Sequence, residues 1–510
     1  MGHLLVSILV IALLALLFGL ATTFVLRSIA PAIGLMDNPD GRRKLQARPV
    51  AVVGGVSVFI ATILTLFSGA WFNIELSEAI RESVPRLAWL GLSATMTICL
   101  GFLDDRFDLR ARYKLFGQIF AVVVLILGGG YLIQTVSLFG YTIEFGVFAV
   151  PVTILWFLAA MNAINLLDGM DGLLGTLGTI IVASLGFMAW YNDNIITAFM
   201  AATIVGALLG FLTFNRPPAS VYMGDAGSMF LGLMIAAMSI QSSLKAPAVA
   251  ILAPVALLVL PFLDTGAAIV RRKLTGRGLA ISDRGHLHHV LQKNGFSVRQ
   301  SLLVVGGLGL IAAGGAIGSV AIANDFLAIA AAVAVVIILL VSGWFGVAET
   351  RLVTTRVRAV LNSAITRSDS VELEVRLQGT AQWEEVWTEI TTRAIVLNLT
   401  SVHLDVNAPA WHEGYHRRWS MRSQPQDQLK NWRVELPLLG HGQVIGRLVV
   451  FGDRGSDCIG EKLVALSDLA KRVEQLAVDA TLPMAEESAR LTRSAEMASL
   501  GHAHASQSIA

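Results

Sequence analysis

The sequence predicts an all-α polytopic membrane protein followed by a smaller α/β domain. Of its 510 residues, 55% are hydrophobic, and the mean hydropathy is +0.67. Long uncharged apolar runs follow one another up to about residue 348. Soluble globular domains do not carry this much apolar sequence. A membrane helix needs about 20 apolar residues, because lipid offers its backbone no hydrogen bonds outside the helix.

Eleven runs come close to this length, and the eighth is the shortest. An odd number of spans places the two ends of the chain on opposite sides of the membrane. The first run has no basic residue before Arg27, so it reads as a retained helix and not as a cleaved signal peptide. The runs are Leu4–Leu26, Val50–Ala70, Leu87–Leu103, Leu115–Ile133, Val147–Leu166, Leu173–Trp190, Ile195–Phe214, Ala226–Gln241, Pro247–Val270, Ser301–Ala321 and Phe326–Ala348.

The loops that follow odd-numbered runs hold most of the basic residues, among them Arg42, Arg43, Lys44, Arg106, Arg110, Lys114, Arg271 and Arg272. The alternate loops hold only Arg81, Arg86 and Lys245. Because Lys and Arg accumulate in cytoplasmic loops, we expect the N-terminus outside and the C-terminal domain in the cytoplasm.

After Ala348 the composition becomes mixed and charged, which predicts a second domain. We expect a membrane domain over 1–348, a cytoplasmic α/β domain over 349–484 and a flexible Ser/Ala-rich tail over 485–510. The patterning of the second domain resembles the end of a GAF-like or PAS-like sensory module, with an unknown ligand or partner. Its expected elements are helices at Glu349–Arg367, Trp383–Leu397 and Glu461–Val478, strands at Val371–Leu377 and Val402–Val406, and a hairpin of Trp432–Leu439 with Gln443–Phe451.

Four polar segments lie beside apolar runs, and all four fall on the predicted cytoplasmic side. In the first, Asp104 and Asp105 are followed by Lys114 at a helix start. Adjacent carboxylates with a nearby ammonium suit a site that binds a cation and an anionic headgroup together. The alternative is a solvated loop whose charges only set the topology.

The second segment carries Asn162, Asn165, Asp168 and Asp171 at the end of a span. Polar side chains at a membrane boundary are costly unless they meet water, one another or a ligand. Such a segment could equally be an Asx-rich turn that joins two helices.

The third segment, Gly224-Asp225-Ala-Gly-Ser228, opens a span and follows Asn215 and Tyr222. Asp225 could cap the helix or offer an oxygen ligand to a hard cation such as Mg²⁺. The fourth segment holds His286, His288 and His289 in a basic loop. Zinc would need further ligands, so hydrogen bonding to phosphate is the better interpretation.

Together, in this order, the four segments resemble the polyprenyl-phosphate N-acetylhexosamine-1-phosphate transferases of glycosyltransferase family 4, over Asp37 to Leu291. The resemblance implies transfer of a sugar 1-phosphate from a UDP-N-acetylhexosamine to undecaprenyl phosphate, with release of UMP. It also implies Mg²⁺ as the cofactor, with Mn²⁺ as an alternative, and Asp225 and Asn165 at the metal. The implied catalytic residues are Asp104, Asp105, Asp168 and Lys114. The implied substrate-binding residues are Lys44, Asn162, Asn165, Asp171, Asn215, Tyr222, His286, His288 and His289.

The spacing His286-Leu-His288-His289 resembles the GlcNAc-1-phosphate branch more than the phospho-MurNAc-pentapeptide translocases, which stay the alternative. A transporter and a membrane sensor are the rivals from other classes. The resemblance implies the bacterial inner membrane, with the active site facing the cytoplasm. No nucleic-acid partner is expected, and a homodimer is left open.

Overall fold

The chain forms two compact units, Met1–Ile269 with His286–Gly346, and Val270–Gly285 with Val347–Ala510. The computed structural model describes residues 2–37, 49–139, 141–242, 249–274, 285–345, 354, 370–378, 383–408, 413–421, 431–440, 443–453, 464, 466–469, 471–475 and 478.

The first unit is helical, and eight of its described helices are long and apolar enough to cross a membrane. The protein is therefore a multi-pass membrane protein. These helices are α1 (Gly2–Ile33), α2 (Gly54–Phe72), α3 (Ile74–Phe107), α4 (Ala111–Gly129), α5 (Ala149–Leu166), α6 (Leu173–Tyr191), α7 (Ile195–Asn215) and α12 (Val298–Ala321).

The other three predicted spans are not among these eight helices. α8 (Gly224–Gln241) and α13 (Asp325–Val341) replace the eighth and the eleventh. The continuous ninth span is wrong in its details, because the chain there forms strand β6 (Val249–Ala250), then α9 (Leu252–Leu257), then α10 (Val259–Leu274). Prolines lie in the early turns of both helices, and proline lacks the N–H that a continuous helix needs.

The third span also begins earlier than predicted. α3 starts at Ile74, where the Asn73 side chain accepts a hydrogen bond from the Leu76 N–H at 2.8 Å. Arg81 and Arg86, assigned to a loop, therefore lie in α3. Because the first half of α3 contains these charged residues, a hydropathy pattern does not indicate a helix there.

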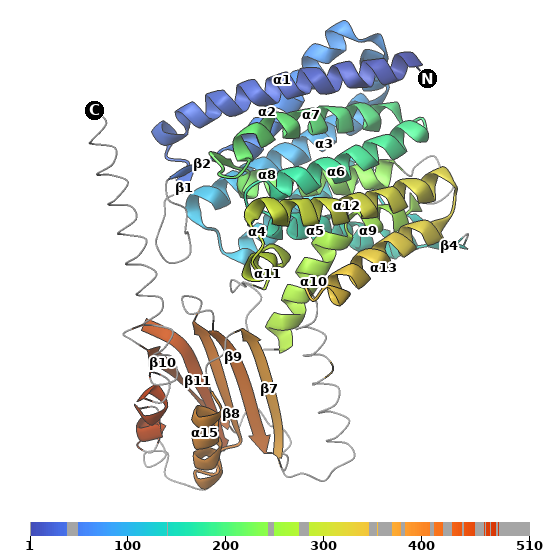
Figure 1. The fold of residues 1–510 in the computed structure, drawn as a ribbon. Helices are drawn as coiled ribbons and strands as arrows, with labels where there is room; N and C mark the ends of the chain where they lie inside the picture. Colours follow the sequence, from blue (N-terminus) through green and yellow to red (C-terminus); the bar gives the residue numbers. More distant parts are fainter. Residues whose placement is uncertain are drawn as a thin grey trace, which may run out of the picture. The chain divides into compact units, whose positions relative to one another are not determined.

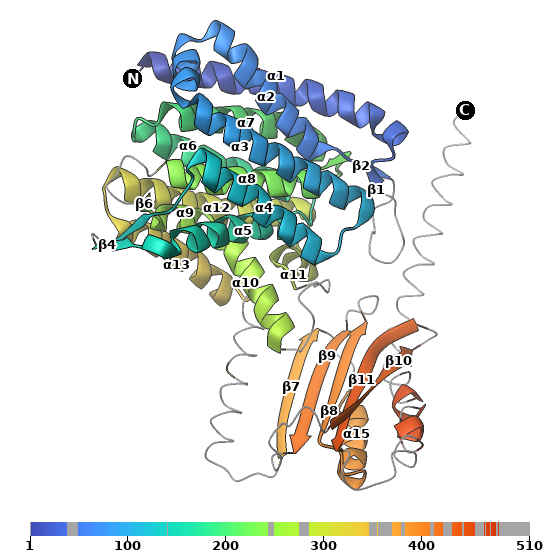
Figure 2. The same cartoon turned by 180° about the vertical axis from the view of Figure 1, so that it is seen from behind.

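Helix α8 lies at the centre of the unit (Figures 1 and 2), in contact with α2, α3, α5 and α6. All its residues from Ala226 to Gln241 are buried. α1 packs on α2 and α7, and α12 packs on α6, α9 and α13. Since neighbouring helices enclose α8, its small and polar residues do not face lipid.

Two small sheets join the loops. Strands β1 (Met36–Asp37), β2 (Val50–Val52) and β5 (Val221–Tyr222) form the first, with β2 and β5 parallel and Val52 opposite Tyr222. β5 directly precedes α8, so this sheet fixes the approach to the start of the central helix. Strands β3 (Thr135–Leu138), β4 (Tyr141–Glu144) and β6 form the second sheet, and a short 3₁₀ helix, η1 (Gly146–Phe148), precedes α5.

The second unit contains an antiparallel sheet in the order β10-β11-β8-β9-β7. Its strands are β7 (Ser370–Gln378), β8 (Ser401–Ala408), β9 (Glu413–Met421), β10 (Asn431–Gly440) and β11 (Gln443–Asp453). Trp383, Trp387 and Tyr415 are the largest of its fully buried side chains. The two tryptophans lie at the start of helix α15 (Glu384–Val396).

The predicted strands, the hairpin and the helix near 383–397 are confirmed. Strand β9 was not predicted, since Arg417 and Arg418 interrupt its apolar alternation. The helix expected at Glu349–Arg367 lies outside the described residues, apart from Thr354. In the expected helix at Glu461–Val478, the described residues are helical.

Candidate active site

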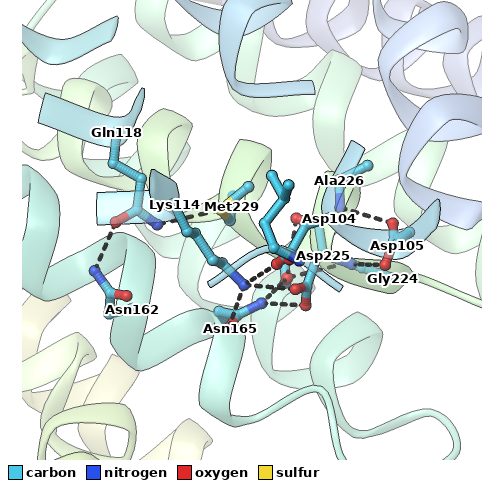
Figure 3. A network of polar contacts seen from close by, with 12 residues as sticks. Asp104, Asp105, Lys114, Gln118, Asn162, Asn165, Gly224, Asp225, Ala226 and Met229 are labelled. Atoms are coloured by element: carbon cyan, nitrogen blue, oxygen red, sulfur yellow. Dashed lines mark hydrogen bonds and ion pairs between the residues drawn. The ribbon is translucent and has the colours of Figure 1, made fainter. Parts of the chain in front are cut away.

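The Lys114 ammonium is the centre of a charged cluster (Figure 3). It lies 2.7 Å from Asp104 Oδ2, 2.5 Å from Asp225 Oδ2 and 3.4 Å from Asn165 Oδ1. Lys114 is in the first turn of α4, Asp104 in the last turn of α3, Asn165 near the end of α5 and Asp225 in the first turn of α8. Three helices, α3, α5 and α8, thus bring oxygen atoms to the positive charge that α4 carries.

Asn165 holds the other side of Asp225. Its Nδ2 donates to Asp225 Oδ1 at 2.7 Å and to Ser228 Oγ, also at 2.7 Å. Each oxygen of the Asp225 carboxylate therefore has a donor, one charged and one neutral. Asp225 does not cap its own helix through these contacts, so the capping interpretation does not describe its side chain.

Asp105 does cap that helix. Its Oδ1 accepts from the Asp225 N–H at 2.8 Å, and its Oδ2 accepts from the Ala226 N–H at 3.1 Å. The first N–H groups of a helix have no partner within it and favour negative charge nearby. The two adjacent aspartates therefore differ: Asp104 pairs with Lys114, whereas Asp105 holds the start of α8.

Glycines allow the backbones to meet here. A Cβ on Gly101 would lie 2.3 Å from the Ala226 Cα, and a Cβ on Gly55 would lie 2.1 Å from the Gly227 Cα. Gly224 has φ of +74°, a left-handed conformation that glycine adopts at no steric cost. The close approach of α2 and α3 to α8 thus depends on residues without side chains.

Asp168 lies beside the same helix start, in the turn after α5. The Gly224 N–H donates to its carboxylate. Burial, with the negative charges of Asp225 and Asp105, raises the pKa of Asp168 from 3.8 to about 8. Protein without a bound ligand thus favours a neutral carboxyl here near neutral pH.

Replacing Asp168 by Asn is expected to stabilise the ligand-free protein at high pH. The pKa is raised in the folded state, so the stability from the neutral carboxyl is full below about pH 4 and is lost as the pH rises to about 8. Asn keeps the neutral shape at every pH. Thermal unfolding should show equal melting temperatures at pH 4 and a variant higher by roughly 2–4 °C at pH 9. A variant that melts below the wild type at pH 9 would contradict this, and Asp325→Asn, at the opposite end of the bundle, is the control.

Asn215 and Asp171 hold the loop that leads to β5. Asn215 Oδ1 accepts from the Gly172 N–H at 2.9 Å, its Nδ2 donates to the Val221 carbonyl at 2.8 Å, and Asp171 Oδ2 accepts from the Ala219 N–H at 2.8 Å. These contacts place Tyr222 beside the cluster. Burial and the acidic side chains of Asp171, Asp37 and Asp168 raise the pKa of Tyr222 to about 12, so its hydroxyl stays protonated.

Asn162 lies one turn before Asn165, and its contacts are with the protein. Its Nδ2 donates to Gln118 Oε1 at 3.0 Å, and Gln118 Nε2 contacts Met229 Sδ at 3.1 Å. Gln118 is fully buried one turn after Lys114. This contact fixes α4 against α5 behind the Lys114–Asn165 pair. Gln118 was not predicted, although its polarity in an apolar helix was a usable signal.

His288 and His289 lie in the short helix α11 (Leu287–Lys293), and His286 directly precedes it. This segment was predicted as a loop. His288 is 2% exposed, and a Cβ on Gly169 would lie 2.7 Å from its ring, so the histidines adjoin the turn that carries Asp168. Burial, with His289 and His286, lowers the pKa of His288 from 6.5 to about 3. Its ring is therefore neutral in the ligand-free protein. The structure thus brings together all the predicted site residues except Lys44, which lies outside the described residues.

Fold and site together define a multi-pass membrane protein with four aspartates, a lysine and amide groups at one end of its central helix. The sequence model of glycosyl transferase family 4 matches residues 87–243. A probable undecaprenyl-phosphate N-acetylglucosaminyl 1-phosphate transferase of Bacillus subtilis (strain 168) is 32% identical over 310 residues, which are 60% of this chain and 83% of that protein.

Two further relatives are undecaprenyl-phosphate alpha-N-acetylglucosaminyl 1-phosphate transferases. That of Yersinia pestis is 30% identical over 57% of this chain and 78% of its own length, and that of Salmonella typhi is 28% identical over 57% and 77%. The chain belongs to glycosyl transferase family 4.

Proposed function

We propose that the protein transfers N-acetylhexosamine 1-phosphate from its UDP conjugate to undecaprenyl phosphate and releases UMP. GlcNAc 1-phosphate is the favoured group, because the relatives are named as transferases of that sugar phosphate. An acceptor phosphate oxygen attacks the sugar-bearing phosphorus, and the bond between that phosphorus and the oxygen bridging to UMP breaks. The observation that supports this proposal most directly is the position of the Lys114 ammonium among oxygens of Asp104, Asp225 and Asn165.

Charge is the main obstacle to this reaction. Both substrates are anions, and phosphoryl transfer depends mostly on positioning and charge stabilisation. Besides the neutral Asp168 carboxyl, the site itself has three carboxylates, from Asp104, Asp105 and Asp225, around a single lysine among the described residues. Two anionic substrates would be repelled from such a cluster. A divalent cation is therefore needed.

The donor set fits Mg²⁺. Oxygens of Asp104, Asp225 and Asn165 already converge on a cation, the Lys114 ammonium. Among the described residues, no three His, Cys, Asp or Glu side chains form a group that could hold a metal alone. Mg²⁺ characteristically uses one or two carboxylates and completes its shell with water and substrate phosphates. We propose that Asp225 and Asn165 hold it, where it would neutralise diphosphate charge, with Mn²⁺ as an alternative.

The remaining roles follow from position. Asp104, paired with Lys114, orients or deprotonates the acceptor phosphate, and Lys114 stabilises the phosphate charge. Asp105 and Asp168 fix the start of α8, which carries Asp225. Tyr222 is proposed to stack on uracil, and the histidines to bind donor phosphates by neutral or charge-assisted hydrogen bonds.

The membrane arrangement is part of the proposal. We propose eleven spans, an outside N-terminus and a site facing the cytoplasm of a bacterial inner membrane, on the distribution of Lys and Arg. The five-stranded sheet with α15 is proposed to be a GAF-like or PAS-like cytoplasmic domain that responds to a ligand or partner. Its suggested extent is 349–484.

Release of UMP by the purified full-length protein tests the function. With undecaprenyl phosphate and UDP-GlcNAc in detergent, we expect UMP only when both substrates and Mg²⁺ are present. EDTA should stop the reaction and added Mg²⁺ should restore it. If no UDP-N-acetylhexosamine gives UMP, the proposed function is wrong. If UDP-MurNAc-pentapeptide is the only donor that gives UMP, it is the donor in place of UDP-GlcNAc. If EDTA leaves the activity unchanged, the reaction does not need the proposed metal ion.

A further inference from the structure

Asp264 is a buried carboxylate outside the cluster described above. It lies in α10 and is 1% exposed. Its Oδ2 is 2.9 Å from His286 Nδ1, and its Oδ1 accepts from the Leu287 N–H at 2.9 Å. Burying a carboxylate is costly unless hydrogen bonds compensate it. Both oxygens of Asp264 are used by the two residues that begin α11.

These contacts fix the tautomer of His286. A carboxylate can only accept, so the proton must be on Nδ1 of the His286 ring. Nε2 is then the ring atom left for a ligand. Asp264 also caps helix α11, because its Oδ1 accepts from the Leu287 N–H and the His286 side chain makes no capping hydrogen bond of its own. A residue of α10 thus sets both the chemistry and the position of the histidine segment.

His288 extends the arrangement towards the charged cluster. Its ring is parallel to that of His286, with an interplanar angle of 6° and centroids 6.1 Å apart. Both ring nitrogens of His288 are buried and have no hydrogen-bond partner among the residues that the structure describes. Buried polar groups without partners are rare and costly, so this ring indicates a site where a ligand supplies the partner. The ring lies against Gly169, next to Asp168.

We propose that Asp264 is a positioning residue for the donor substrate, acting through His286 and the start of α11. This inference rests on the proposed function. Asp264 keeps the proton on Nδ1 of His286, and by fixing α11 it holds His288 against the Asp168–Gly169 turn. It touches no reacting atom. Donor binding therefore depends on a carboxylate in a different helix from the histidines.

Asp264→Asn separates the two contacts. The Asn oxygen can still accept from the Leu287 N–H, whereas its NH₂ group would face Nδ1 of His286 and favour the opposite tautomer. We expect the KM for the UDP-sugar to rise roughly 10–100-fold, as for other residues that orient a ligand-binding histidine. The KM for undecaprenyl phosphate should stay within about twofold. Equal changes in both KM values, or none, would overturn the inference.

Asp325→Asn is the matched control. Asp325 also accepts from a backbone N–H, that of Phe139 at 2.9 Å, but at the far end of the bundle. It should leave both KM values unchanged. If Asp264 acts through His286, adding Asp264→Asn to His286→Gln should have no further effect on the donor KM. If the rise in the donor KM of the double variant equals the product of the two single rises, Asp264 acts independently of His286.

The tautomer can be measured without turnover. In protein with ¹⁵N-labelled histidine, the His286 signals, identified by their loss in His286→Gln, should show a protonated Nδ1 in the wild type and a protonated Nε2 in Asp264→Asn. A wild type with an unprotonated Nδ1 would overturn the inference even if UMP is released. If no UMP is released, the proposed function fails, while the spectrum still decides whether Asp264 orients His286.

Discussion

Asp225→Asn is expected to lower turnover on the order of 10²–10³-fold without unfolding the protein. One Asp225 oxygen accepts from Lys114 and the other from Asn165 Nδ2. An amide has one oxygen, so its NH₂ group must face one of these donors. It also removes a negative charge that the proposed cation requires. The cluster keeps its shape but loses its strongest ligand.

Initial rates of UMP release over a range of Mg²⁺ concentrations test this expectation. The variant should need more Mg²⁺ for its residual activity, and its melting temperature should stay close to that of Asp325→Asn. If Asp225→Asn reacts at the wild-type rate at low Mg²⁺, Asp225 neither binds the metal nor takes part in the reaction. Unfolding would be recognised by the melting temperature, and Asp225→Glu, which keeps the charge, then becomes the test of ligand geometry.

Gly101→Ala is expected to destabilise the protein and to abolish most activity. The new Cβ would lie 2.3 Å from the Ala226 Cα and 2.7 Å from the Asp225 carbonyl carbon. Both are backbone atoms, so α3 and α8 must separate. Overpacking of this kind costs about 1–3 kcal/mol. It also moves Asp104 and Asp105 away from α8, and a shift of about 1 Å at a site can cost 10²-fold in rate.

Gly91→Ala is the matched control on the same helix. A Cβ at Gly91 would have no atom of the described residues within 4 Å, so we expect normal activity and stability equal to or slightly above the wild type. Melting temperature and UMP release are measured for both variants. Equal behaviour of the two would show that the contact of α3 with α8 does not set the site. A stable but inactive Gly101→Ala would locate the effect in the geometry of the site alone.

Periodicity and hydropathy were enough to predict most of the helices, because each span must satisfy its own backbone within lipid. They failed where polar residues or prolines interrupt the pattern. The first half of α3 carries Arg81 and Arg86, and the predicted ninth span breaks into α9 and α10. Strand β9 was missed because Arg417 and Arg418 interrupt its apolar alternation. Its sequence alone does not show that it pairs with β7 and β8 in the sheet.

The sequence could indicate which segments meet, but not what each side chain does there. Asp104 and Asp105 are neighbours in sequence, yet one pairs with Lys114 and the other holds the N–H groups of α8. That difference depends on where α8 begins. Asp264 was missed, although a single carboxylate near the end of an apolar run is itself a signal of function.

The mass of the lipid product tests the central claim most directly. After reaction with UDP-GlcNAc and Mg²⁺, undecaprenyl phosphate should gain one phosphate and one N-acetylhexosamine, and UMP should appear in equal amount. That result requires cleavage between the two phosphates of the donor. A lipid that gains the sugar without the phosphate, with release of UDP, would contradict the account, because the sugar and not the phosphorus would then have been attacked.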